Sequence, residues 1–186
     1  MTIDFVSRRT LLAIARHAIG SAVDPEQHSD AAAVDHALPV LAELRGAFVT
    51  LHQRGRLRGC IGRIEPDAPL RVLVPDVARA AALSDPRFPA VRADDLRTLV
   101  IEISLLSVLA TVKDVDEIEI GRHGLVIAAR GRRGLLLPQV AVEFGWSRAE
   151  FLSEVCAKAG LAPDAWRDEG VRLQSFTAEV FSEQDE

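Results

Sequence analysis

The chain has 186 residues, of which 48% are hydrophobic and 26% are charged, as in an ordinary globular protein. Its formal net charge of −5 and its lack of tyrosine argue against a protein that coats nucleic acid through overall charge or an aromatic platform. Two cysteines without a C-x-x-C spacing form neither a disulfide framework nor a recognisable zinc motif. The length fits one domain over residues 1–186, with room for a smaller lobe.

The N-terminus does not resemble a targeting segment. Asp4 precedes Arg8 and Arg9, and Arg16 interrupts the apolar stretch that follows, which is unlike a signal peptide. The longest apolar segment, residues 99–112, is too short to span a bilayer. We therefore expect a cytoplasmic protein without a membrane segment.

The first forty residues predict one helix followed by a polar connection. Apolar residues recur at helical spacing over residues 7–20, and Ser7 and Gly20 suit the two caps. Residues 21–36 are polar and rich in alanine, which predicts a loop with marginal helical character.

A β-hairpin is predicted next. Residues 47–52 and 56–61 are rich in β-branched and apolar side chains, and the turn between them contains Gly55. The register of this hairpin decides which way its cysteine points.

If Gln53 pairs with Arg56, strict alternation places Cys60 on the same face as Val49 and Leu51. The thiol would then lie on a face that is half apolar and half cationic.

The rest of the chain alternates helices and strands. The predicted elements are a helix over 70–83 that Pro75 kinks or restarts, a stiff loop over 85–89, a strand over 100–105, a hairpin of 124–129 with 134–137, a helix from Ser147 to Gly160, and a final strand over 171–181. Ser147 and Glu150 form the S-x-x-E pattern of a capping box. Because no series of βαβ units with dinucleotide-binding glycines occurs, the pattern predicts an α+β fold.

The segment Leu57-Arg58-Gly59-Cys60-Ile61-Gly62 is the strongest candidate for a functional site. The two flanking glycines clear space beside the thiol, so that a ligand or another stretch of backbone can approach closely. Arg58 and the nearby Arg63 favour the thiolate, the form that acts as nucleophile or ligand. The alternative is a small cysteine packed at a tight strand crossing, because free cysteine is often buried.

The histidines offer a partner for this thiol but no metal motif. His123 lies in a predicted turn, where it could act as a base for Cys60 or simply satisfy the turn. Cys60, His52 and His123 show no recognised ligand spacing, so we predict no metal and no cofactor. Cys156 lies on the apolar side of a predicted helix and is expected in the core.

Arginines gather in both predicted hairpins and near their ends. They are Arg54, Arg56, Arg58 and Arg63 in the first, and Arg130, Arg132 and Arg133 in the second. Brought together by folding, they would form a positive patch suited to a small phosphate, carboxylate or nucleotide ligand. The alternative is a set of solvated hairpin tips balanced by acidic residues.

The proline-rich loop at residues 85–89 also has two interpretations. In the structural one, Arg87 pairs with a nearby aspartate and Phe88 anchors the loop. In the functional one, Arg87 points into a cleft beside Cys60.

Taken in order, these motifs resemble the AMMECR domain family, which in microbes is the A protein of the AmmeMemoRadiSam system. The resemblance rests on Phe48-Val49-Thr50-Leu51, Leu57-Arg58-Gly59-Cys60-Ile61-Gly62, Asp85-Pro86-Arg87-Phe88, Gly121-Arg122-His123-Gly124-Leu125, Gly134-Leu135-Leu136-Leu137-Pro138-Gln139-Val140, Gly145-Trp146, Phe151-Leu152, Lys158-Ala159-Gly160-Leu161 and Trp166. It covers most of the chain from about residue 40 to the end.

The resemblance implies a two-lobed α+β fold, with a mainly antiparallel sheet flanked by helices and a cleft near the L-R-G-C-I-G segment. It also implies a link to a Memo-like protein and a radical SAM enzyme. Because the family has no settled activity, the resemblance specifies a fold better than a reaction. In the cleft we expect Cys60 as the catalytic candidate, and Arg58, Gly59, Ile61, Gly62, Arg87 and His123 as candidate ligand-binding residues.

The favoured function is an accessory component of a Memo- and radical-SAM-linked modification system, with a ligand cleft around Cys60. One alternative is a thiol-dependent enzyme with Cys60 as nucleophile. The other is a non-catalytic adaptor that binds an anionic small molecule or a peptide through arginines. Nucleic-acid contact through the two hairpins ranks last, because the net charge is negative.

Overall fold

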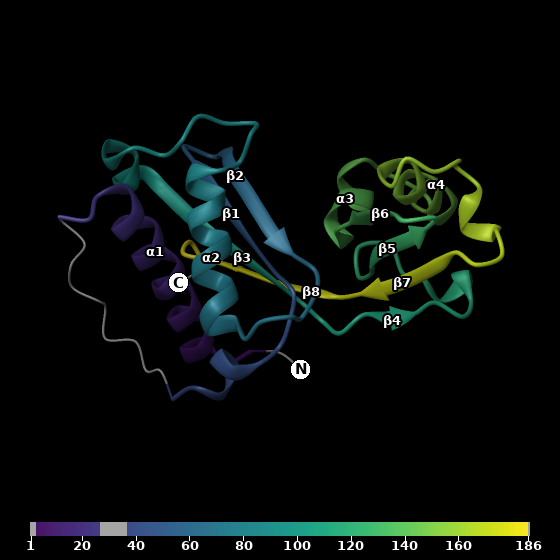
Figure 1. The fold of residues 1–186 in the computed structure, drawn as a ribbon, viewed down its shortest axis with the longest axis horizontal. Coiled ribbons are helices and arrows are strands. Elements are labelled where there is room, and N and C mark those ends of the chain that lie inside the picture. The colour runs from purple at the N-terminus through teal and green to yellow at the C-terminus, as the bar shows by residue number, and fades with distance from the viewer. Residues whose placement is uncertain (1–2, 27–36, 186) are drawn as a thin grey trace. The chain divides into compact units, whose positions relative to one another are not determined.

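The computed structural model describes residues 3–26 and 37–185, which fall into two compact units (Figure 1). The first unit contains the chain up to Leu106 together with Glu179 onward, and the second contains Ser107–Ala178. Each unit has a four-stranded sheet and a hydrophobic core of its own.

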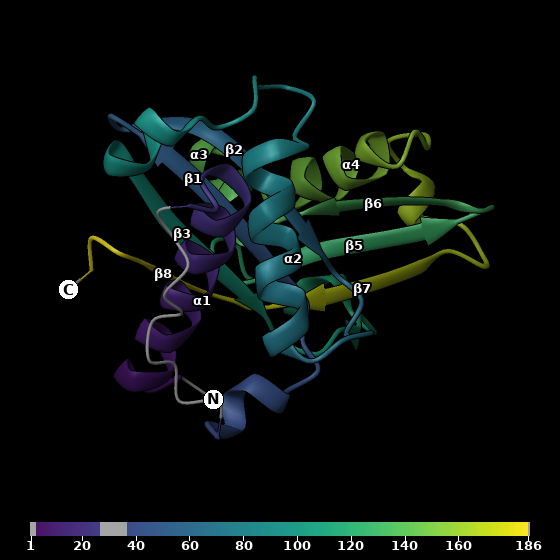
Figure 2. The same cartoon turned by 60° about the vertical axis from the view of Figure 1, so that its left-hand side comes forward.

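The first unit places two helices against its sheet. Its elements are α1 (Phe5–Val23), the 3-10 turns η1 (Pro39–Ala42) and η2 (Ala93–Thr98), β1 (Ala47–Gln53), β2 (Arg56–Arg63), α2 (Leu70–Leu83), β3 (Leu99–Leu106) and β8 (Ala178–Ser182). The strand order is β2-β1-β3-β8. The helix α2 packs against β1 and β2, and α1 packs against α2, as Figures 1 and 2 show.

Apolar alternation in the strands determines which face of this sheet the helices cover. In β1, Val49 and Leu51 are fully buried, and they lie opposite Ile103 and Ile101 of β3. The same cluster contains residues from α1 and α2, so this face is the core of the first unit. The residues between them in β1 are half-buried and point to the opposite face.

The helix α1 begins earlier and ends later than predicted. Asp4, rather than Ser7, is the N-cap, because the Asp4 carboxylate accepts hydrogen bonds from the Ser7 backbone N–H at 2.9 Å and the Ser7 hydroxyl at 2.7 Å. The bond from the Ser7 backbone is the main reason that the pKa of Asp4 is lowered. The helix also runs past Gly20 and ends at Val23. Residues 27–36, which belong to the predicted polar connection, lie outside the described residues.

The hairpin forms at the predicted position, but its register contains an irregularity. Gln53 pairs with Arg56 as predicted, and the pairing then shifts between Leu51 and His52. Arg58 is the extra residue, so β2 carries a β-bulge at this point.

The bulge reverses the predicted facing of the cysteine. Cys60 pairs with Thr50, and directly opposite residues share a face of an antiparallel sheet. The prediction that Cys60 lies with Val49 and Leu51 was therefore wrong, because the extra residue moves every later side chain of β2 to the other face.

The second unit is an antiparallel sheet with two short helices packed on it. Its elements are β4 (Ala110–Thr111), η3 (Val115–Glu117), β5 (Gly124–Ala129), β6 (Arg132–Leu136), α3 (Pro138–Glu143), α4 (Arg148–Lys158), η4 (Ala165–Arg167) and β7 (Arg172–Phe176), with the strand order β4-β7-β5-β6. The predicted capping box is present, since Ser147 accepts from the Glu150 N–H and Glu150 accepts from the Ser147 N–H. Cys156 is fully buried in this core, as expected.

The last stretch of chain forms two strands rather than the single strand predicted over residues 171–181. β7 pairs within the second sheet and β8 within the first. Between them, the Thr177 N–H donates to Ser107 Oγ at 3.0 Å, and the Thr177 carbonyl accepts from the Ser107 N–H at 2.8 Å. Alternation cannot reveal such a break, because both segments remain extended.

The predicted fold class is confirmed: the protein is α+β, with antiparallel sheets flanked by helices. In the part of the chain that the structure describes, no helix has both the length and the apolarity needed to cross a membrane.

Candidate functional site

Cys60 lies on β2, on the face of the first sheet that points away from α2. Its side chain is half-buried, and its Sγ accepts a hydrogen bond from the Thr50 hydroxyl at 3.3 Å. Thr50 in turn lies opposite Glu102 of β3. One row of this face therefore runs from a thiol through a hydroxyl to a carboxylate across three neighbouring strands.

The loop after α2 holds the backbone of Cys60 at the edge of the sheet. The buried carboxylate of Asp85 accepts a hydrogen bond from the Cys60 N–H at 2.8 Å, and Arg87 Nη2 donates to the Cys60 carbonyl oxygen at 3.1 Å. Because β2 is an edge strand, these two groups would otherwise lack a neighbour. The loop takes the place of a further strand.

Asp85 and Arg87 also bind each other tightly. Arg87 Nε and Nη2 donate to the Asp85 carboxylate at 2.9 and 2.7 Å. The Arg87 guanidinium, helped by the N–H of Cys60, holds the pKa of the Asp85 carboxyl far below its usual range despite burial. The same hydrogen bond raises the pKa of Arg87. Of the two predicted roles for Arg87, the structure shows its pairing with a nearby aspartate.

Close packing explains both glycines that flank the cysteine. A Cβ on Gly59 would lie 2.2 Å from the carbonyl oxygen of Ala81 in α2. A Cβ on Gly62 would lie 2.3 Å from the ring of Phe48. Gly59 therefore admits the helix backbone on one face of the sheet, while Gly62 admits an aromatic ring on the other.

Two other predicted residues have roles within their own units. Ile61 packs against the core of the first unit. His123 lies in the second unit, where its Nδ1 accepts a hydrogen bond from the Glu119 N–H at 3.1 Å and so satisfies the turn. Within residues 3–26 and 37–185, no three metal-ligating side chains are gathered in one place.

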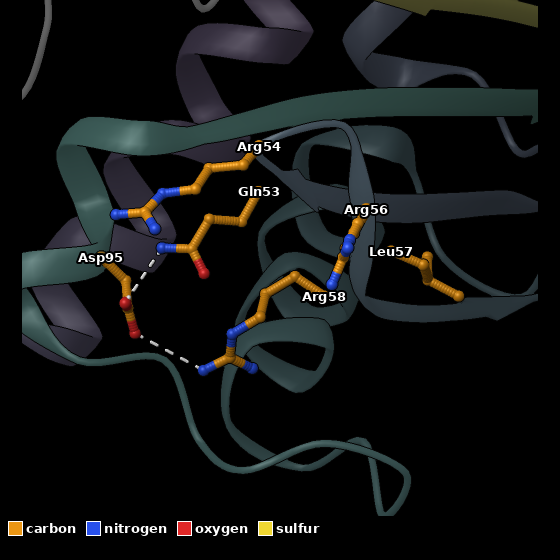
Figure 3. A pocket seen from close by; sticks show the side chains of 6 residues that line it. All are labelled: Gln53, Arg54, Arg56, Leu57, Arg58 and Asp95. Carbon is orange, nitrogen blue, oxygen red and sulfur yellow. Dashed lines mark hydrogen bonds and ion pairs between the residues drawn. The ribbon is translucent and has the colours of Figure 1, made fainter.

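A separate cavity of about 670 Å³ lies at the tip of the β1–β2 hairpin (Figure 3). Its lining residues are Gln53, Arg54, Arg56, Leu57, Arg58 and Asp95. Arg58 is 14% exposed and donates to the carbonyl oxygens of Pro89 and Ala90, with Asp95 at 3.5 Å. Three arginines and one carboxylate therefore line a single hollow, and of the three arginines Arg58 contacts the carboxylate.

The remaining arginines of the predicted positive patch are otherwise engaged. Arg63 pairs with Asp76 at 3.4 Å and with Asp67 at 3.6 Å. In the second unit, the Arg130 guanidinium lies 3.5 Å from the Asp168 carboxylate, and the Arg132 guanidinium donates to the carbonyl oxygen of Gly160.

Three important residues escaped the sequence analysis as site residues. The sequence predicts Thr50 only as a strand residue, because its contact with Cys60 depends on the β-bulge. Gln53 and Asp95 line the hairpin cavity, and Gln53 Nε2 donates to Asp95 Oδ1 at 3.0 Å. Since these two lie 42 positions apart, no local pattern signals their contact.

The chain belongs to the AMMECR1 family, whose pattern matches residues 12–181. It is 41% identical to a protein of Methanosarcina barkeri over 97% of this chain and 92% of that protein. A protein of Methanocaldococcus jannaschii is 45% identical over 77% of this chain and 76% of its own length.

A solved structure supports the same relationship at the level of the fold. The crystal structure of an uncharacterized protein from Pyrococcus horikoshii, PH0010, matches with a TM-score of 0.81 and 38% identity. The match covers 94% of this chain and 90% of that one. The resemblance inferred from the motifs is therefore confirmed.

Proposed function

We propose that the protein is an accessory component of a Memo- and radical-SAM-linked modification system, and that it holds a ligand or partner group at Cys60. The observation that carries the proposal is the fixed presentation of this thiol. Asp85 and Arg87 bind its backbone, and Thr50 donates to its sulfur. A side chain held this rigidly at the edge of a sheet can present one atom to a ligand with little loss of entropy.

Alkylation of the folded chain tests whether the thiol is available. Iodoacetamide forms a bond between sulfur and carbon as iodide leaves, and mass spectrometry identifies the labelled cysteine. Cys156 serves as the internal control, because burial raises the pKa of its thiol and removes it from solvent. We expect Cys60 to react at least about tenfold faster than Cys156 at pH 7. Labelling of Cys60 only after unfolding would contradict the proposal.

A thiol-dependent enzyme is the second candidate, and the hydrogen bond from Thr50 to the Cys60 sulfur favours it. A hydroxyl donor stabilises negative charge on sulfur, which is the charge of an attacking thiolate. Thr50→Val removes the donor while preserving shape, and we expect it to slow alkylation several-fold. Thr111→Val, at an exposed threonine of β4, is the matched control and should leave the rate unchanged. Equal rates in both variants would remove this candidate.

The link to partner proteins is tested directly by mixing. The purified chain, a Memo-like protein and a radical SAM enzyme from one genome are analysed together by size-exclusion chromatography. We expect co-elution that Cys60→Ala weakens and that Cys156→Ala does not. Separate elution of the three proteins over micromolar concentrations would contradict an accessory role in a stable complex.

A further inference from the structure

The cavity at the tip of the first hairpin carries more positive charge than its surroundings neutralise. Asp95 is the one acidic residue of its lining, and its pKa is lowered mainly by the hydrogen bond from Gln53. Its carboxylate also accepts the N–H of Arg92 at 3.0 Å and lies 3.5 Å from Arg58. Within the described residues, the side chains of Arg54 and Arg56 form no hydrogen bond or ion pair, so their charge is available to a ligand.

The backbone of the hairpin turn positions one of these arginines. Arg54 has φ of 53° and Gly55 has φ of 74°, the left-handed conformations of a two-residue hairpin turn. Asparagine or glycine is favoured at the first of these positions, and a larger side chain there is strained. The same conformation recurs at Arg130 in the second unit, so it does not by itself mark a site; its effect here is to hold Arg54 among the residues that line the cavity.

The β-bulge positions another arginine of the cavity lining. Bulges redirect side chains near binding sites, and this one leaves Arg58 as the unpaired residue of β2. The redirected guanidinium is fixed by the carbonyl oxygens of Pro89 and Ala90, so it enters the cavity lining already oriented. Figure 3 shows Gln53 and Arg58 reaching Asp95 from different strands of the hairpin.

The geometry points to a binding site for the phosphate group of a small molecule, formed by Arg54, Arg56 and Arg58. Guanidinium groups match phosphate oxygens through paired hydrogen bonds, and two unpartnered arginines suit a group that carries close to two negative charges. This site lies on the hairpin tip and does not depend on any role for Cys60.

The amide of Gln53 gives the site a further preference. Its Nε2 donates to Asp95 and to Thr98 Oγ1 at 2.9 Å, which leaves its oxygen without a donor among the described residues. A ligand hydroxyl could fill that position. We therefore expect a phosphate monoester of a polyol to bind more tightly than inorganic phosphate.

Calorimetric titration of the full-length chain with inorganic phosphate and with glycerol 3-phosphate tests the site. Removal of one charge-assisted contact should weaken binding by about 10- to 100-fold. The informative variants are Arg56→Ala and Arg54→Asn, because asparagine suits the left-handed turn and removes the guanidinium without straining the backbone. We expect both to bind glycerol 3-phosphate more weakly and to remain folded.

Two matched controls make the outcome decisive. Arg130 has φ of 52° in the corresponding turn of the second unit, so Arg130→Asn repeats the backbone change away from the cavity. Arg71→Ala removes an exposed arginine from α2. Both should bind glycerol 3-phosphate as the parent does.

The proposal would be overturned if the parent chain did not bind glycerol 3-phosphate at millimolar concentration, or if the control and test variants weakened binding equally. Far tighter binding of a single-stranded oligonucleotide with a steep dependence on salt would also overturn it.

Discussion

At the scale of single residues, Asp85 contributes most to the candidate site. Its carboxylate is buried and accepts hydrogen bonds from Cys60 and Arg87 together. Without it, the Cys60 N–H at the edge of β2 would lose its acceptor, and Arg87 would lose its ion pair. One carboxylate therefore maintains both the edge of the sheet and the position of the thiol.

The first prediction concerns the dependence of stability on pH at Asp85. Folding lowers the pKa of Asp85, so the ionised Asp85 carboxylate stabilises the folded state. This contribution to the free energy of unfolding is fully present above the unfolded pKa of about 3.9 and is lost progressively as the pH falls below that value. Asp85→Asn should lower the free energy of unfolding by about 1–3 kcal/mol at pH 7 and by less near pH 3. Urea denaturation at both pH values measures the difference.

Asp94→Asn is the control for this prediction, because Asp94 is an exposed carboxylate in the nearby turn η2. It should change the free energy of unfolding by less than about 0.5 kcal/mol at either pH. A loss in Asp85→Asn that is the same at pH 7 and pH 3 would show that charge plays no part.

The second prediction concerns Gly59. An alanine Cβ would meet the Ala81 carbonyl oxygen at 2.2 Å, and a backbone atom cannot move aside as a flexible side chain can. We expect Gly59→Ala to lower the free energy of unfolding by about 1–3 kcal/mol through overpacking. Denaturant unfolding checks this, and unchanged stability would show that α2 can shift away from β2.

At the scale of secondary-structure elements, several features were predictable because their signals are local. The helix α2 spans the predicted residues 70–83 despite Pro75, and the capping box of α4 starts at Ser147 as its sequence indicates. Periodicity and capping involve neighbours within one or two turns, so they can be recognised from the sequence alone. The first hairpin was predictable in position for the same reason.

The facing of Cys60 was not predictable, because a β-bulge leaves no mark in the alternation of side chains. Arg58 is the extra residue, and its position follows from contacts with Pro89 and Ala90, which lie about thirty positions away. The division between β7 and β8 has a similar origin, since Thr177 bonds to Ser107, which lies 70 positions earlier in the chain. Distant contacts of this kind determine the candidate site.

The third prediction belongs to α4. The Ser147 side chain accepts the Glu150 N–H, and the Glu150 carboxylate accepts from the Ser147 N–H at 2.7 Å. Ser147→Ala should lower the free energy of unfolding by about 1 kcal/mol. Ser153→Ala, within the same helix, is the control and should have a smaller effect. Equal losses measured by denaturant unfolding would show that the cap contributes nothing specific.

At the scale of the whole molecule, the chain builds two hydrophobic cores. The first collects buried residues of α1, α2, β1 and β3, and the second collects those of α4, β5 and β7. The chain leaves the first unit after Leu106 and returns to it at Glu179, so the second unit is an insertion in sequence between β3 and β8. Both Cys60 and the hairpin cavity belong to the first unit.

Because the two units have separate cores, removing one methylene from a core should loosen chiefly the unit that contains it. Ile103 and Ile127 are each fully buried, the first in the core of unit 1 and the second in that of unit 2. Ile103→Val and Ile127→Val each remove one methylene and should lower stability by about 0.5–1.5 kcal/mol. Because partial opening follows cooperative units, hydrogen exchange should accelerate chiefly in β1 and β3 for the first variant and in β5 and β7 for the second. Equal acceleration of all four strands in both variants would show that the two cores open together, and that any ligand at the first unit also stabilises the second.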